Sequence, residues 1–109
     1  MYKIFFYVPQ THLETVKQAL FDKGAGRIGN YDHCAWQSEG IGQFRALAGS
    51  NPAIGQKNRL EIVAEWKVET VCDEWMLQDI INALVHTHPY EKPVYGYCKI
   101  ESNQGCLVF

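Results

Sequence analysis

The chain has 109 residues and a formal net charge of −2, from 10 basic and 12 acidic side chains. This length suits one domain with a modest hydrophobic core. The basic residues are scattered, and no apolar run reaches the roughly 18 residues of a helical membrane span, so both nucleic-acid binding and a membrane location are poor expectations. The four cysteines lie in a chain without a secretory signal pattern, which predicts free thiols in the cytoplasm.

The first part of the chain predicts a strand followed by a helix. Aromatic and branched residues fill 2–8, which indicates a buried strand. Thr11 and Glu14 have the spacing of a capping box, which places a helix start at Thr11. Glycines in 24–30 are expected to end this helix. Because the glycines follow a helix instead of preceding one, we interpret 24–30 as a tight connection, not as a phosphate-binding loop.

The middle of the chain predicts strands joined by a long loop. The segments 34–39 and 43–47 resemble two short strands that meet at the glycines of 40–42, in a turn or at a bulge. Several turn residues over 48–58 indicate a loop that is long enough for a lid or a subunit contact. Apolar and charged residues alternate over 60–72, which predicts a long strand with one solvated or interface face.

The last part predicts a second helix and a final strand. Asp73 is the expected cap of this helix, and Pro89 prevents its continuation. The segment 94–100 reads as a strand, and 106–109 as a short edge strand. The order β-α-β-β-β-α-β predicts a single α+β domain over 1–109 with a ferredoxin-like (split β-α-β) fold, in which two helices cover one face of an antiparallel sheet.

The stretch 86–93, His-Thr-His-Pro-Tyr-Glu-Lys-Pro, joins the second helix to the last strand. It gathers two imidazoles, a phenol, a carboxylate and an amine, and its two prolines restrict the backbone. Such a corner can hold a ligand, and it can also serve only to end a helix. Both interpretations stay open from the pattern alone.

Four separated motifs, 24–34, 42–45, 51–55 and 88–95, together resemble the YqfO-type insert domain of the NGG-interacting-factor family. The His-Pro-Tyr-Glu element is also similar to one in CutA, the divalent-cation tolerance protein. The resemblance implies a CutA-like antiparallel sheet with two helices on one face and a homo-oligomer, a trimer built through sheet edges. The larger family's two-metal site lies in flanking lobes, so the resemblance does not carry a hydrolase activity to this chain.

Three of these motifs supply side chains suited to a small-molecule cleft, either within one chain or between subunits. Arginine can grip a carboxylate or phosphate through two hydrogen bonds, while aromatic rings form a rigid apolar wall. In the alternative interpretation, the rings belong to the core or to an interface, and the arginine pairs with a glutamate. The candidate ligand-binding residues are Asn30, Tyr31, His33, Phe44, Arg45, His88, Tyr90 and Glu91.

A divalent metal, copper or zinc, is the alternative ligand. The residues with suitable donor atoms are His33, Cys34, His86 and His88. Their spacing matches no common zinc motif, and the adjacent His33 and Cys34 would point to opposite faces of a strand. Cys34 beside His33 also suggests nucleophilic catalysis by the thiol. No third orienting residue is evident, however, and we assign no catalytic residue.

We therefore expect a cytoplasmic, non-enzymatic ligand-binding or regulatory module that forms a homo-oligomer, a trimer. A copper- or zinc-binding homeostasis protein is the second hypothesis, and a weak hydrolase is the third.

Overall fold

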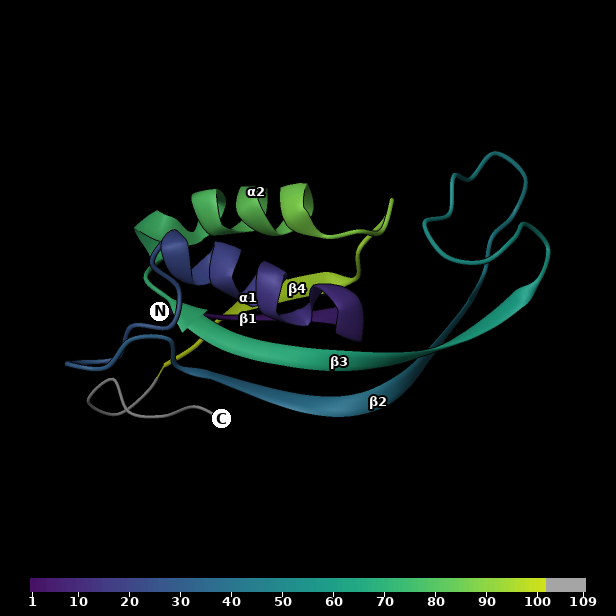
Figure 1. Cartoon of the computed structure of the whole chain (residues 1–109). Helices are drawn as coiled ribbons and strands as arrows, with labels where there is room; N and C mark the ends of the chain where they lie inside the picture. Colours follow the sequence, from purple (N-terminus) through teal and green to yellow (C-terminus); the bar gives the residue numbers. More distant parts are fainter. Residues whose placement is uncertain (102–109) are drawn as a thin grey trace.

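The computed structural model describes residues 1–101. Four strands form one antiparallel sheet in the order β2-β3-β1-β4, and two helices cover one of its faces (Figure 1). This is the α+β, ferredoxin-like arrangement that the sequence predicts. The elements are β1 (Tyr2–Pro9), η1 (Gln10–His12), α1 (Leu13–Asp22), β2 (Ala35–Arg45), β3 (Leu60–Cys72), η2 (Glu74–Met76), α2 (Leu77–Thr87) and β4 (Tyr95–Lys99).

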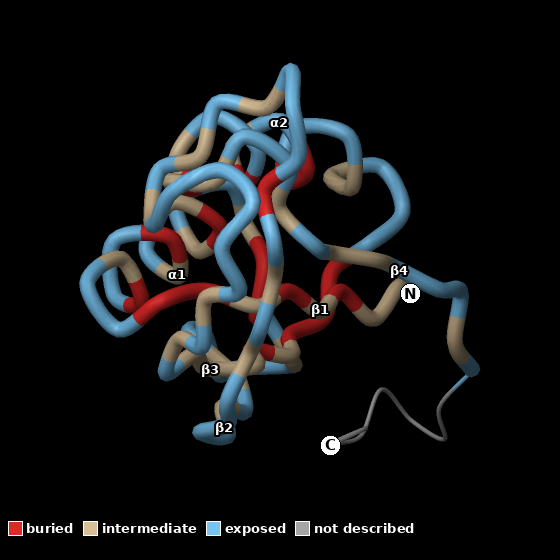
Figure 2. Tube along the Cα trace, turned by 90° about the vertical axis from the view of Figure 1, so that its right-hand side faces the viewer, coloured by how far each residue is buried: buried red, intermediate tan, exposed pale blue. Residues whose placement is uncertain are grey.

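The core lies between the two helices and the central strands, where Figure 2 shows the buried segments of the trace. Strand β1 pairs with β3 on one side and with β4 on the other, so it is covered on both edges. Its alternation places Ile4, Phe6 and Val8 against the helices, fully buried, and Phe5 and Tyr7 on the other face. The helices bury the apolar stripes Leu13, Val16, Leu20 and Ile80, Ile81, Leu84.

The start of α1 differs from the prediction. Thr11 lies inside the 3-10 turn η1, and the helix begins two residues later, at Leu13. The first turn is closed by the backbone, because the Leu13 N–H donates to the Gln10 carbonyl. The Thr11 hydroxyl contacts His12 Nδ1 at 2.9 Å, and Glu14 pairs with Lys17, so neither residue caps the helix. The predicted capping box is wrong, since a 3-10 turn takes its place.

The start of the second helix follows the same plan. Asp73 is extended, with ψ 151°, and precedes the 3-10 turn η2 without a side-chain cap. The predicted cap at Asp73 is therefore also wrong. The end of α2 is as predicted, because His88 leaves the helical conformation directly before Pro89.

The end of α1 confirms the prediction from its glycines. Gly24 has φ +101°, in the left-handed region that glycine adopts without strain. The Ala25 N–H donates to the Leu20 carbonyl at 3.1 Å, and the Gly24 N–H donates to the Phe21 carbonyl at 3.0 Å. This pair of hydrogen bonds is a Schellman motif, which satisfies carbonyls that a helix end leaves free. The irregular connection 24–34 then leads to β2.

Strand β2 corrects a second prediction. It runs without interruption from Ala35 to Arg45 and pairs with β3 along its whole length, from Ala35↔Thr70 to Arg45↔Leu60. The glycines of 40–42 therefore lie within one strand, and the predicted turn or bulge between two short strands is wrong. The predicted strand over 60–72 is confirmed as β3.

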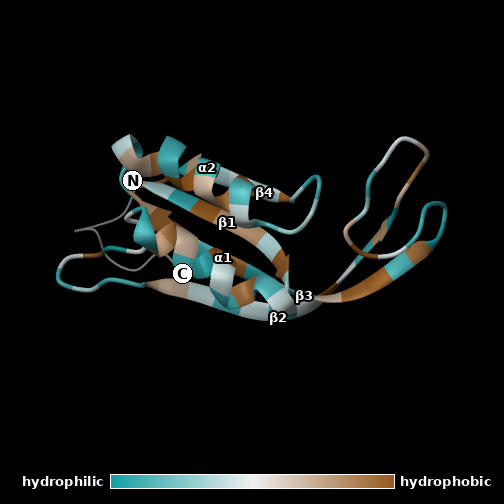
Figure 3. Cartoon of the chain, turned by 45° about the horizontal axis from the view of Figure 1, so that its top comes forward, coloured by the Kyte–Doolittle hydropathy of each residue, from teal (hydrophilic) through white to brown (hydrophobic). Residues whose placement is uncertain are grey.

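The distal halves of β2 and β3, residues 41–45 and 60–64, extend beyond the helices and are called the arm below (Figure 1). The molecule measures 48 × 24 × 22 Å as a result. The arm continues the sheet face that the helices cover elsewhere, and it leaves Ile41, Leu60 and Ile62 exposed by 81, 56 and 67%. Figure 3 shows this end of β3 as strongly hydrophobic.

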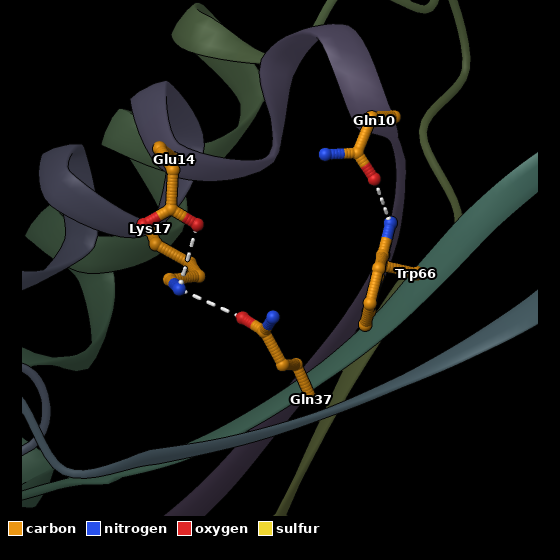
Figure 4. A network of polar contacts seen from close by, with 5 residues as sticks. All are labelled: Gln10, Glu14, Lys17, Gln37 and Trp66. Carbon is orange, nitrogen blue, oxygen red and sulfur yellow. Dashed lines mark hydrogen bonds and ion pairs between the residues drawn. The ribbon is translucent and has the colours of Figure 1, made fainter.

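Polar contacts tie the first helical segment to the sheet (Figure 4). Lys17 donates to Glu14 at 2.9 Å and to Gln37 at 2.7 Å, which joins α1 to the edge strand β2. The Trp66 indole donates to the side-chain carbonyl of Gln10, which joins β3 to η1. These contacts fix the position from which the arm leaves the body of the domain.

Three further predictions concern the chain as a whole. Within residues 1–101, Cys34, Cys72 and Cys98 carry free thiols, as expected, and Cys106 lies outside this part of the chain. The edge strand predicted at 106–109 lies outside the described residues. Within residues 1–101 no helix is long and apolar enough to cross a membrane.

Candidate functional site

A cavity of about 330 Å³ lies where the arm meets the segment 88–94, which connects α2 to β4. The loop after β2 contributes a third wall. The lining is mainly aromatic and aliphatic, with a few polar groups. The lining residues are Tyr7, Gly42, Gln43, Phe44, Ala46, Ser50, Pro52, Ala53, Ile54, Glu65, Tyr90, Glu91, Lys92 and Val94.

The floor of the cavity is organised around Tyr90. Its ring lies 6.2 Å from the Phe44 ring, centroid to centroid, at an interplanar angle of 53°. Its hydroxyl donates a hydrogen bond of 2.8 Å to Glu65 Oε2 on β3. Burial raises the pKa of Tyr90, and the Glu65 carboxylate raises it further, so the phenol stays a proton donor. The pair links the connection after α2 to β3, directly beside the arm.

Glu91 holds the loop side of the cavity. Its Oε1 accepts the backbone N–H of Asn51 at 3.1 Å, across 40 positions of sequence. The loop itself is closed at its base, where the Asn58 N–H donates to the Ala46 carbonyl at 2.6 Å. The wall formed by 50–54 is therefore tied both to the arm and to the segment after α2.

His88 supports this arrangement from the core. Its side chain is buried, and Nε2 lies 2.6 Å from the Tyr7 carbonyl while Nδ1 lies 3.1 Å from the Tyr90 N–H. A carbonyl can only accept and an amide N–H can only donate, so the proton resides on Nε2 and Nδ1 is the acceptor. Burial lowers the pKa of His88, against the opposing effect of the Tyr7 carbonyl. His88 is thus a neutral residue that positions Tyr90.

The predicted ligand-binding residues fall into two groups within one chain. Phe44, Tyr90 and Glu91 line the cavity, and His88 lies directly behind it. Arg45 follows Phe44 on the arm and is exposed.

The second group, Asn30, Tyr31 and His33, lies beyond the other end of β2. Strand β2 has 11 residues, and at about 3.3 Å per residue it separates Phe44 and Arg45 from this second group by roughly 30 Å. His88 lies beside Tyr7, which is level with the middle of β2. One chain does not bring the two groups together. Their meeting between subunits stays a prediction.

The four candidate metal ligands are also spread over the molecule. Both ring nitrogens of His88 have protein partners, while His86 is exposed on α2. His33 contacts Asp32 at 3.1 Å, and the Cys34 thiol faces the Asp32 carbonyl at 3.7 Å. Among residues 1–101 no three His, Cys, Asp or Glu side chains form a group that could hold a metal ion.

Sequence reasoning missed several lining residues. Glu65 reads as a solvent-facing position of an alternating strand, and Tyr7 reads as part of the first strand. The available signal was Gly42, because a glycine inside a strand often marks a close approach of another group. The sequence predicts a loop over 48–58 but gives no reason to select Pro52, Ala53 and Ile54 as ligand-binding residues, although they form the loop wall.

Comparison with known proteins shows which proteins contain a domain similar to this chain. No family model matches the chain. It is 43% identical over 105 residues to a GTP cyclohydrolase 1 type 2 homolog of Halalkalibacterium halodurans, covering 96% of this chain and 28% of that protein. It is 44% identical over 99 residues to the corresponding protein of Bacillus subtilis, covering 91% and 26%. The chain thus spans about a quarter of the length of these relatives.

Solved structures show the same relationship. A Bacillus cereus protein related to NIF3 superposes with a TM-score of 0.78 at 39% identity, covering 93% of this chain and 26% of that one. The chain is homologous to the CutA-like insert domain of these NIF3-related proteins. CutA of Pyrococcus horikoshii superposes on the domain with a TM-score of 0.66 at 15% identity, covering 94% of this chain and 86% of that one. At this identity the likeness to CutA concerns the fold, and the predicted CutA-like fold is confirmed.

Proposed function

We propose that this CutA-like domain is a non-enzymatic module that binds a small molecule in the cavity between the arm and residues 88–94. The observation that carries the proposal is the cavity itself, built from three separate segments that polar contacts join. Its volume of about 330 Å³ falls within the usual range for small-molecule sites, roughly 300–1,000 Å³. Its mainly apolar walls with few polar groups are also typical of such sites.

The proposal is tested by a ligand-observed NMR screen of the full chain with ammonium, carboxylate and neutral fragments. Binding should be lost in Ala53→Trp, which places an indole in the cavity. Ala48→Trp is the matched control, because Ala48 is an exposed residue of the same loop that does not line the cavity. Binding lost only in Ala53→Trp supports the proposal. No binding in any of the three classes, or equal binding in both variants, would overturn it.

The domain is further proposed to act as a homo-oligomer, the trimer that the resemblance implies. The support is the arm, where Ile41, Leu60 and Ile62 form an exposed apolar surface. Contiguous apolar surface of this kind is typical of protein interfaces. In addition, β2 is an edge strand of 11 residues, and a long unpaired edge is a template for contact with another chain.

Native mass spectrometry tests the oligomer. Ile62→Glu should shift the wild-type trimer towards monomer, because it places a charge in the proposed interface. Thr15→Glu on the exposed side of α1 is the control and should leave the trimer intact. A monomeric wild-type protein would overturn this part of the proposal and leave the cavity proposal standing.

A further inference from the structure

The charges around the cavity are not balanced by the protein itself. Glu65 and Glu91 each accept one hydrogen bond, from the Tyr90 hydroxyl and from the Asn51 N–H. Neither carboxylate takes part in an ion pair with another residue of the described chain 1–101. Lys92 is the one basic residue among the described residues of the lining, so the charged side chains of the lining carry a net charge of −1.

Aromatic rings share the cavity lining with these carboxylates. Tyr7, Phe44 and Tyr90 all line the cavity, and the last two form a corner at 53°. The face of an aromatic ring is negative, so it attracts a cation that lies over it. The rings and the carboxylates therefore both favour a positively charged ligand.

The same face of the sheet already holds an ammonium in this way. Lys67 Nζ lies 5.5 Å from the Phe5 ring centroid and 3.7 Å from Glu69 Oε1. Phe5 and Tyr7 are edge-to-face neighbours on β1, with 6.2 Å between centroids. Glu65 lies two residues before Lys67 on the same face of β3. The cavity thus offers rings and a carboxylate, as beside Lys67, but within residues 1–101 the Glu65 carboxylate has no ion-pair partner.

We infer that the cavity selects a small organic cation, an ammonium group with an apolar body, and this inference rests on the proposed binding function. The ammonium would lie against the Glu65 carboxylate and the rings of Tyr7 and Tyr90, and the apolar body would lie against Pro52, Ala53 and Ile54. Among the described residues that line the cavity, Lys92 is the one basic side chain that would favour a phosphate or carboxylate ligand, and it is outnumbered by the two carboxylates.

The test compares choline with two matched compounds, neutral 3,3-dimethylbutan-1-ol and anionic 3,3-dimethylbutanoate. Choline and the alcohol have the same shape and differ only in nitrogen and charge. Choline should bind the full chain about tenfold or more tightly than the alcohol, as expected for an ion pair plus cation–π contact. The butanoate should bind more weakly than either. Affinities are measured by NMR titration.

Glu65→Gln keeps an acceptor for the Tyr90 hydroxyl but removes the charge, so the preference for choline should fall towards unity. Glu61→Gln is the control, because Glu61 lies on the arm outside the lining and should leave the preference unchanged. Equal binding of choline and the alcohol, tighter binding of the butanoate, or no choline binding overturns the inference. If the alcohol binds and Ala53→Trp abolishes that binding, the proposed function survives this failure.

Discussion

Gly42 lies directly against the carboxylate of Glu65, its diagonal neighbour across the β2–β3 pair. A methyl group on residue 42 would come to 1.8 Å from Glu65 Oε1 and 2.8 Å from its carboxyl carbon. The missing side chain lets Glu65 lie over the β2 backbone and reach the Tyr90 hydroxyl. A glycine in the middle of a strand, which costs conformational entropy, therefore has a structural reason at the candidate site.

Gly42→Ala should break the contact between Glu65 and Tyr90. The added methyl displaces the end of a flexible side chain, so the fold survives, but the Tyr90 phenol loses its partner. We expect a loss of about 1 kcal/mol in the free energy of unfolding relative to Gly40→Ala, measured by urea denaturation. Gly40→Ala is the matched control because residue 40 has open space around it and should gain up to about 0.5 kcal/mol. Equal stability of the two variants would contradict the role assigned to Gly42.

His88 should make the stability depend on pH. Its pKa lies below the ordinary value of 6.5 because the folded protein buries it. Just below pH 6.5 the unfolded chain binds more protons at this residue than the folded protein, so the free energy of unfolding falls as the pH drops. This contribution is fully present above pH 6.5 and is lost towards the folded-state pKa.

The effect of His88 is measured by urea denaturation at about pH 7.5 and about pH 5.5. The lowered pKa of Glu69, which is held down by its hydrogen bond to Lys3, acts only below its ordinary value of 4.5 and so lies outside this window. His88→Gln should reduce the change between the two pH values, whereas His86→Gln, an exposed change on α2, should not. An unchanged pH response in His88→Gln would show that another group is responsible.

Thr11→Ala should have little effect on stability. Among the described residues, the Thr11 hydroxyl has one hydrogen-bond partner, His12, and caps no backbone N–H, so we expect a change below about 0.5 kcal/mol. A true helix cap would cost about 1 kcal/mol when replaced by alanine. Thermal or urea unfolding distinguishes the two values, and the larger loss of stability would show that Thr11 caps the helix.

Phe6→Ala should be the most damaging of these substitutions. Phe6 is fully buried on the helix-facing side of β1, and its removal leaves a cavity, so we expect a loss of about 3–5 kcal/mol. Trp75→Ala removes a larger ring that is 78% exposed and should cost less than about 0.5 kcal/mol. Urea unfolding compares them, and a similar cost for both would mean that Trp75 is covered in solution.

The sequence predicts the sheet and helix bodies well because their apolar periodicity follows directly from burial. Strand β3 and the Gly24 helix end are examples. The predicted helix starts are wrong, because the sequence pattern does not distinguish the 3-10 turns η1 and η2 from the first turn of an α-helix. The prediction of two short strands in place of β2 is wrong because a glycine pair usually marks a turn. Pairing with β3 instead keeps Gly40 and Gly42 in one strand.

The candidate site is only partly readable from sequence. Tyr90 and Glu91 stand out because they lie in a dense polar motif between prolines. Glu65 does not stand out in the sequence, because its role depends on which residue of β2 lies beside it. That neighbour is set by the register of the β2–β3 pair. Periodicity gives the face of a strand but not its cross-strand neighbour. For the same reason, the sequence does not reveal that β2 separates His33 from Phe44.

The most direct test of the binding site is a ¹H–¹⁵N shift map of the full chain, titrated with the fragment that binds it best. Perturbed amides should gather in 42–54 and 88–94, the segments that surround the cavity. A second, polar hollow near Lys17, Phe21 and His33 provides an internal comparison at the far end of β2. Shifts centred on 30–37, or spread without a centre, would contradict the account and move the site away from Tyr90.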